Sequence, residues 1–282
     1  MTFSSPAADA FVPDGAPLAT ALARTSHLCI AAHQDDIEIM AYPGIAACHG
    51  RADQWFTGVV VTDGAGSPRT GRFARCSDEQ MKAVRRDEQR RAAKIGRYSA
   101  VLQLAHPSAV VKNPRAPEVA ADLAAVLTQA TPHTVYLHNP ADKHDTHVAV
   151  FLRSLAALRA LPAARRPRHV FGCEVWRDLD WLLDADKRVL DASPQPRLAA
   201  KLVAVFESQI AGGKRYDLAA AGRRLAHATF HTSHATDQTT ALTFAMDLTP
   251  LVQNRRLSVE RFTLRHIERL RADVAERIRK FA

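Results

Sequence analysis

Three side chains that can bind a metal or move a proton stand directly after an apolar run near the start of the chain. The run covers 28–32, and His33, Asp35 and Asp36 follow it. A buried strand that ends in this way places one imidazole and two carboxylates at its exit. Imidazole and carboxylate are ligands of catalytic zinc, and a carboxylate that stays free beside the metal can act as a base. The segment therefore predicts part of a metal centre.

A second cluster of histidines lies further along the chain. His138 ends an apolar run, and His144 and His147 stand at the start of a predicted helix. His144 and His147 are three residues apart, so they share a face if this turn is helical. A shell of two nitrogens and one carboxylate, with a fourth position open for water, is a common catalytic zinc site. The two clusters together would supply such a shell, with His147 as the second nitrogen and His138 as the alternative.

The remaining side chains of these clusters would then be free for catalysis. Asp35 would lie beside the metal and could take a proton from water. His144, one turn before His147, could act as a general acid or as a cation near the developing oxyanion. The turn around Asp142 and Lys143 is interpreted as solvated.

Alternating strands and helices would position these residues. Continuous apolar runs alternate with helix-like stretches, which favours βαβ units and a mostly parallel sheet covered on both faces. In such a sheet ligands bind beyond the carboxyl ends of the strands, where both clusters would lie. The fold class predicted is α/β and Rossmann-like. The expected strands are 28–32, 58–62, 100–104, 134–138 and 169–176, and the expected helices are 37–49, 77–95, 117–130 and 146–161.

The C-terminal part has a different pattern, with more helix. Helices are expected over 197–210 and 214–229, and a strand over 239–249. A charged helix over 257–281 carries one apolar stripe, whose spacings of three and four residues are typical of a docking face. The stripe could pack on the core of the same chain, which is the default expectation, or on a second subunit in a homo-oligomer. Its residues are Leu264, Ile267, Leu270, Val274 and Ile278.

The overall composition is that of an ordinary globular protein. The 282 residues are 47% hydrophobic and 24% charged, and no apolar run approaches the length that spans a bilayer. The N-terminus lacks the pattern of a signal peptide, and the four cysteines are scattered, which favours reduced thiols and a cytoplasmic location. The net charge of +9 is spread over arginines in several helices, so we expect neither a nucleic-acid nor a membrane partner.

The ordered motifs resemble the PIG-L/LmbE-like family of zinc-dependent N-deacetylases. The family's Ala-His-Pro-Asp-Asp-Glu motif is similar to residues 32–37 here, and its His-Pro-Asp-His motif is similar to residues 144–147. Between them, the glycine-rich segment 62–66 and Arg85 to Glu88 resemble the family's loop and its Arg-x-x-Glu helix. Ser208-Gln209 resembles a later Ser-Gln. The resemblance covers roughly residues 27–209.

The resemblance implies a role for each matching position. It implies Zn²⁺ held by His33, Asp36 and His147, and so it favours His147 over His138. It implies Asp35 as general base, His144 as acid or electrostatic stabiliser, and Arg85 as a substrate-binding cation. The implied reaction is hydrolysis of an N-acetyl or other N-acyl group on a small substrate, an amino sugar or its conjugate.

Three positions depart from the family's motifs. Gln34 replaces proline and can donate a hydrogen bond, whereas Ile37 replaces glutamate, so that the outer carboxylate is missing or supplied by Glu38. The acid of the second motif is displaced to Asp145, which on a helix points elsewhere. These departures keep a second hypothesis open, in which the chain is a non-catalytic metal- or carbohydrate-binding member of the same fold.

The domain organisation follows from the same patterns. Residues 21–282 are predicted to form a single domain with a C-terminal extension over about 210–282. Residues 1–20, with several prolines and an Asp-Gly pair, are predicted to be a loose tail.

Overall fold

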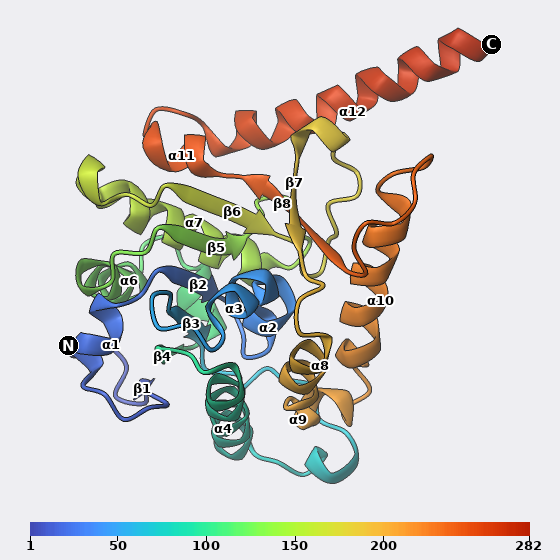
Figure 1. The fold of residues 1–282 in the computed structure, drawn as a ribbon. Helices are drawn as coiled ribbons and strands as arrows, with labels where there is room; N and C mark the ends of the chain where they lie inside the picture. Colours follow the sequence, from blue (N-terminus) through green and yellow to red (C-terminus); the bar gives the residue numbers. More distant parts are fainter.

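A computed structural model describes all residues from 1 to 282 and contains one eight-stranded sheet (Figure 1). The strand order is β1-β4-β3-β2-β5-β6-β8-β7. The five central strands from β4 to β6 are parallel, whereas β1, at one edge, and β8, beside β6, each pair antiparallel. The strands are β1 (Asp9–Phe11), β2 (His27–Ala31), β3 (Phe56–Thr62), β4 (Ala100–His106), β5 (Thr134–His138), β6 (His169–Cys173), β7 (Lys187–Asp191) and β8 (Leu242–Asp247).

Helices cover both faces of this sheet. In the N-terminal half they are α1 (Leu18–Ala23), α2 (Asp36–Met40), α3 (Tyr42–Cys48), α4 (Asp78–Gly96), α5 (Ser108–Lys112), α6 (Glu118–Gln129) and α7 (Asp145–Ala160). In the C-terminal half they are α8 (Pro196–Ala204), α9 (Glu207–Ile210), α10 (Tyr216–Phe230), α11 (Thr249–Gln253) and α12 (Val259–Phe281). Short 3₁₀ turns cover Gly71–Phe73, Ala163–Arg165 and Asp184–Asp186.

The central strands are apolar on both sides, as a sheet between two helical layers requires. In β2, Leu28 and Ile30 belong to one buried cluster and Cys29 and Ala31 to the other. The first cluster packs against α1, α6 and α7, and the second packs against α2, α3, α4 and α8. The predicted fold class is therefore confirmed, including the extra C-terminal helices.

Local sequence signals explain two of the helix boundaries. Helix α4 begins at a capping box, in which the Ser77 hydroxyl accepts from the Gln80 backbone and the Gln80 side chain accepts from the Ser77 backbone. The helix predicted over 37–49 is instead two helices that meet at Ala41, because Pro43 in the first turn of α3 favours a new helix start.

The N-terminal tail was wrongly predicted to be loose. Residues Asp9–Phe11 form β1, which pairs antiparallel with β4, and the backbone N–H of Ser4 donates to Asp122 Oδ1 at 2.9 Å. The free edge of β4 offers unpaired backbone groups that an extended segment can satisfy. A composition rich in turn-forming residues does not reveal this pairing.

Helix α12 packs on the body of the protein only through its first turns. Phe262, Thr263 and His266 are buried there, whereas Leu264 is 48% exposed and Ile278 is 63% exposed. The far half of α12 extends beyond the rest of the molecule (Figure 1). The default expectation that the apolar stripe packs on the core is therefore wrong, and association through the stripe stays a prediction.

None of the helices combines the length with the apolar composition that a membrane span needs.

The partly buried ring of His27, at the start of β2, should make stability depend on pH. It stacks on Tyr136, and burial, reinforced by His133, lowers its pKa to about 4. Below pH 6.5 the unfolded chain gains a proton that the folded ring resists, so stability should fall by about 2 kcal/mol between pH 7.5 and pH 5. Urea unfolding should show a flatter pH dependence in this window for His27→Gln. An unchanged slope would contradict this assignment.

Candidate metal centre and substrate cavity

The ends of three neighbouring strands gather the predicted site residues. Strands β3, β2 and β5 are parallel neighbours, so their carboxyl ends meet at one edge of the sheet. His33 and Asp36 follow β2, Thr62 ends β3, and His147 lies in the first turn of α7 after β5. Segments far apart in the sequence thus converge, as expected for a ligand site beyond the carboxyl ends of parallel strands.

His33, Asp36 and His147 bring three ligand atoms together. His33 Nδ1 lies 3.2 Å from Asp36 Oδ2 and 3.2 Å from His147 Nε2, and His147 Nε2 lies 3.3 Å from Asp36 Oδ2. Ligands at about 2.0–2.1 Å from one tetrahedral zinc lie about 3.3 Å from one another. The three donors therefore fit a single zinc ion, and the backbone N–H of His33 also donates to Asp36 Oδ2 at 2.8 Å.

Contacts among these side chains shift the pKa values of the two buried ligands, Asp36 and His147. Burial would raise the pKa of Asp36, but the charges and hydrogen bonds of His147 and His33 outweigh it and hold the pKa well below its usual range. Burial works against an imidazolium at His147, yet Asp36 and Asp142 raise its pKa to about 9. A metal that binds here must therefore displace a proton from His147.

His138 lies near the same cluster but its ligand nitrogen is occupied. Asp36, His138 and His147 together could also hold an ion, and the centroids of the stacked His138 and His147 rings are 3.9 Å apart. However, the backbone N–H of Ala32 donates to His138 Nε2 at 2.9 Å. Because a backbone amide can only donate, the lone pair of this nitrogen is used. The geometry thus favours His33 over His138 as the third ligand.

Asp142 supports the cluster from behind, so its interpretation as part of a solvated turn is wrong. The side chain is buried, and Asp142 Oδ2 lies 3.3 Å from His147 Nδ1. Asp142 also accepts from the backbone N–H of His144 at 3.0 Å and from that of Trp176 at 3.2 Å. A carboxylate behind a metal-binding histidine fixes its tautomer and ring orientation.

Asp142→Asn should therefore weaken metal binding without removing a ligand. The expected loss of zinc affinity is about 10- to 100-fold, because the amide holds His147 Nδ1–H less strongly than the carboxylate. Competition with a chromophoric chelator would measure this loss. Lys143→Ala, at the exposed neighbouring position of the same turn, is the control and should bind zinc like the native chain. Equal affinity of Asp142→Asn and the native chain would contradict the supporting role.

Asp35 lies beside the three donors but is held by other partners. Its φ of +90° is one that residues other than glycine rarely adopt. Arg85 Nη2 donates to Asp35 Oδ2 at 2.8 Å, and Gln89 Oε1 accepts the backbone N–H of Asp35 at 3.3 Å. Burial raises the pKa of Asp35 to about 6, against the opposing charge of Arg85. Such a buried, perturbed carboxyl in a cavity is typical of a general base.

Arg85 is buried and its terminal nitrogens already have protein partners. Besides Asp35, it pairs with Glu88 at 3.1 Å and donates to the backbone oxygen of Gln34. Glu88 in turn accepts from the backbone and hydroxyl of Ser208, both at 2.7 Å. The structure thus brings the predicted substrate-binding cation to Asp35, where it positions the carboxylate from the edge of the cavity.

A sequence profile described as PIG-L, GlcNAc-PI de-N-acetylase, matches residues 28–158. This segment contains all three candidate metal ligands, His33, Asp36 and His147. The matched segment, just under half of the chain, is similar to the PIG-L family. A comparison with curated proteins found no match.

Solved structures share the fold of this chain at low sequence identity. A conserved protein from Thermus thermophilus is 18% identical, with a TM-score of 0.59 over 79% of this chain and 94% of its own. The N,N'-diacetylchitobiose deacetylase from Pyrococcus horikoshii is 17% identical, with a TM-score of 0.61 over 80% and 85%. The 4-carboxy-2-hydroxymuconate hydratase GalB from Pseudomonas putida KT2440 is 18% identical, with a TM-score of 0.57 over 79% and 95%. Since one of these is a hydratase, the fold alone does not identify the reaction.

The structure shows the surroundings of the residues that depart from the PIG-L motifs. Gln34 is buried and donates to Thr62 O at 3.4 Å and to Gln103 at 3.3 Å, so it does act as a donor. Glu38 accepts from Gln89 and Tyr98, at 2.8 and 2.7 Å. Because Gln89 also holds the backbone of Asp35, Glu38 supports Asp35 through Gln89. Asp145 is exposed in the first turn of α7, as its displacement predicted.

A cavity of about 420 Å³ opens in front of the candidate metal site, within the range of small-molecule sites. His144 stands on its wall, where its ring stacks on Trp176 with centroids 6.0 Å apart and touches the ring of His147. Burial, His147 and His33 lower the pKa of His144. Most of the wall is polar and includes Thr62, Ser67, Ser108, Lys112, Gln209 and Lys214.

Sequence reasoning missed the aromatic part of this cavity. Trp176 follows β6 and Tyr216 begins α10, and both line the cavity together with Asp35 and Asp36. Trp176 could have been found because it also lies just beyond a strand of the parallel sheet. Tyr216 lies outside the segment matched to the PIG-L family and carries no motif.

Proposed function

We propose that this chain is a zinc-dependent hydrolase that removes an N-acetyl or other N-acyl group from an amino sugar or its conjugate. The observation that carries the proposal is the triangle of His33, Asp36 and His147, with the buried carboxylate of Asp35 beside it. The description of the matching family, GlcNAc-PI de-N-acetylase, supports the reaction and the class of substrate.

Each residue of the site would have a distinct role. His33, Asp36 and His147 would hold zinc, which when bound supplies Lewis-acid polarisation and makes a water more acidic. Asp35 would accept the proton of the attacking water, with Arg85 keeping its carboxylate in place. His144 has a lowered pKa and would be neutral near pH 7, so its ring would donate a hydrogen bond to the substrate from the cavity wall.

The polar cavity supports an amino sugar as the amine part of the substrate. Hydroxyl, amide and ammonium groups line it, and these can pair with sugar hydroxyls or with an acidic group of a conjugate. Only 2 of the 17 residues that line this larger cavity are hydrophobic.

Amine release from acetylated sugars tests the proposal. The zinc-loaded protein would be incubated with N-acetylglucosamine, N,N'-diacetylchitobiose and glycosides of N-acetylglucosamine, and free amine would be measured with an amine-reactive dye. We expect release that stops with a chelator and returns with added zinc. Zinc binding without release from any acylated amine would contradict catalysis and favour a binding protein.

A further inference from the structure

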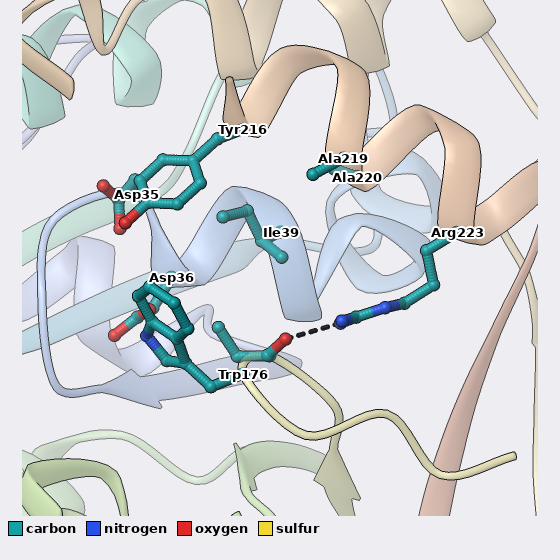
Figure 2. Close-up of a pocket in the computed structure, with 9 residues that line it drawn as sticks. Asp35, Asp36, Ile39, Trp176, Tyr216, Ala219, Ala220 and Arg223 are labelled. Atoms are coloured by element: carbon teal, nitrogen blue, oxygen red, sulfur yellow. Dashed lines mark hydrogen bonds between the residues drawn. The ribbon is translucent and has the colours of Figure 1, made fainter. Parts of the chain in front are cut away.

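A second, smaller cavity of about 160 Å³ adjoins the polar one (Figure 2). The two share Asp35, Asp36, Trp176 and Tyr216, so they meet beside the carboxylates of the candidate metal site. The smaller cavity is mainly apolar, and its other walls are Ile39, Val175, Ala219, Ala220 and Arg223.

Small side chains create this apolar cavity. Figure 2 shows Ala219 and Ala220 on α10 facing Ile39 on α2, with Trp176 and Tyr216 at the end nearest the carboxylates. A larger side chain at either alanine would occupy the space between the two helices. The volume of this cavity is several times the roughly 30 Å³ that one water molecule occupies in the liquid. A methyl group is similar in size to a water molecule, so the cavity has room for more than the methyl group of an acetyl.

Two consecutive arginines fix the walls of the apolar cavity. Arg224 is buried and donates from Nη2 to the backbone oxygens of Glu38 at 2.9 Å and Ile39 at 3.0 Å, which ties α10 to α2. Arg223 donates to the backbone oxygen of Val175, which ties α10 to the segment after β6 (Figure 2). The cavity is thus built into the fold, and its affinity for a ligand is not reduced by a need to order its walls.

We infer that this apolar cavity binds the acyl chain of the substrate and that the preferred acyl group is longer than acetyl. The inference rests on the proposed function, which assigns the polar amine part to the larger cavity. The scissile amide would lie where the cavities meet, and the remaining, acyl side of that bond then points between α2 and α10. The substrate class is an N-acyl amino sugar with an unbranched acyl chain longer than two carbons.

A binding experiment tests this inference without depending on turnover. The zinc-loaded Asp35→Asn variant would be titrated by calorimetry with N-acetyl-, N-butyryl- and N-hexanoylglucosamine. Each methylene buried in the cavity should tighten binding by about fourfold. The native chain should show a parallel rise in kcat/KM for the same series.

Two variants of neighbouring alanines provide the comparison. Ala220→Phe fills the cavity and should abolish the gain with chain length. Ala221→Phe makes the same change at the next residue, which is exposed and outside the cavity, and should keep the gain. Both variants retain the arginines that hold α10, and circular dichroism would check their folding.

The outcomes separate this inference from the proposed function. Chain-length-dependent binding without hydrolysis would uphold the acyl cavity and contradict the reaction. Hydrolysis with the acetyl compound bound most tightly would overturn the acyl inference and leave the reaction standing. A gain from alkyl chains on the amine side of an acetylated compound, abolished by Ala220→Phe, would also overturn it.

Discussion

Asp35→Asn should leave the protein loaded with zinc while lowering its rate of N-acyl hydrolysis by about 100- to 10,000-fold. The three donors of the metal triangle do not include Asp35, so metal content should match that of the native chain. An amide cannot take up the proton of the attacking water. Asparagine also tolerates positive φ better than most residues, so the backbone at this position should be preserved.

Metal analysis and a kcat measurement on the same preparation would check this result. Asp145→Asn is the matched control, because Asp145 is exposed near the site and has no role in the proposed reaction. Full activity of Asp35→Asn would remove Asp35 from the role of base. Loss of zinc together with activity would instead mean that Asp35 helps to hold the metal.

His33→Ala should lower zinc affinity by more than about 100-fold, beyond the effect of losing an outer partner such as Asp142. The variant removes one corner of the triangle, and the carboxylate and imidazole that remain cannot make three protein ligands. The side chain of His33 is partly exposed, so truncation should leave little cavity and the fold should persist.

The zinc affinity of His33→Ala should be compared with that of His138→Gln. Glutamine can still accept the backbone N–H of Ala32, and the triangle does not use His138. We therefore expect His138→Gln to bind zinc much more tightly than His33→Ala in a chelator competition. The reverse order would replace His33 by His138 in the ligand set, as the group of Asp36, His138 and His147 would allow.

The sequence predicted the residues at the strand exits well, for a physical reason. Apolar runs that are buried on both faces must be strands between helical layers, and parallel strands direct their carboxyl ends to one edge. His33, Asp36 and His147 could therefore be placed together from the sequence alone. The resemblance had favoured His147 over His138, and the contact of His138 with Ala32 supplies a physical reason for leaving His138 out of the ligand set that no sequence pattern contains.

What could not be predicted depends on tertiary burial. Asp142 lies in a turn whose residues resemble those of a solvated loop, and only the packing of β5 and α7 buries it behind His147. Arg85 appeared as a free cation, whereas Asp35 and Glu88 occupy its guanidinium. Trp176 and Tyr216 come from segments without motifs.

The edge strands of the sheet could not be predicted from the sequence patterns either. Strands β1 and β7 are short and contain no buried residue, so they lack the apolar runs that identify the central strands. The stripe on α12 has the period of a docking face, but periodicity does not specify the partner, and here most of the stripe faces solvent.

The anchoring of α10 by Arg223 and Arg224 has a consequence for how this protein could acquire new substrates. The proposed metal ligands and base all lie within residues 28–158, whereas most walls of the apolar cavity come from 175–223. If both proposals hold, separate stretches of the chain would determine the reaction and the choice of substrate. Exchange of the α10 segment, with its two arginines retained, would let evolution or an engineer change the substrate while inheriting the reaction intact.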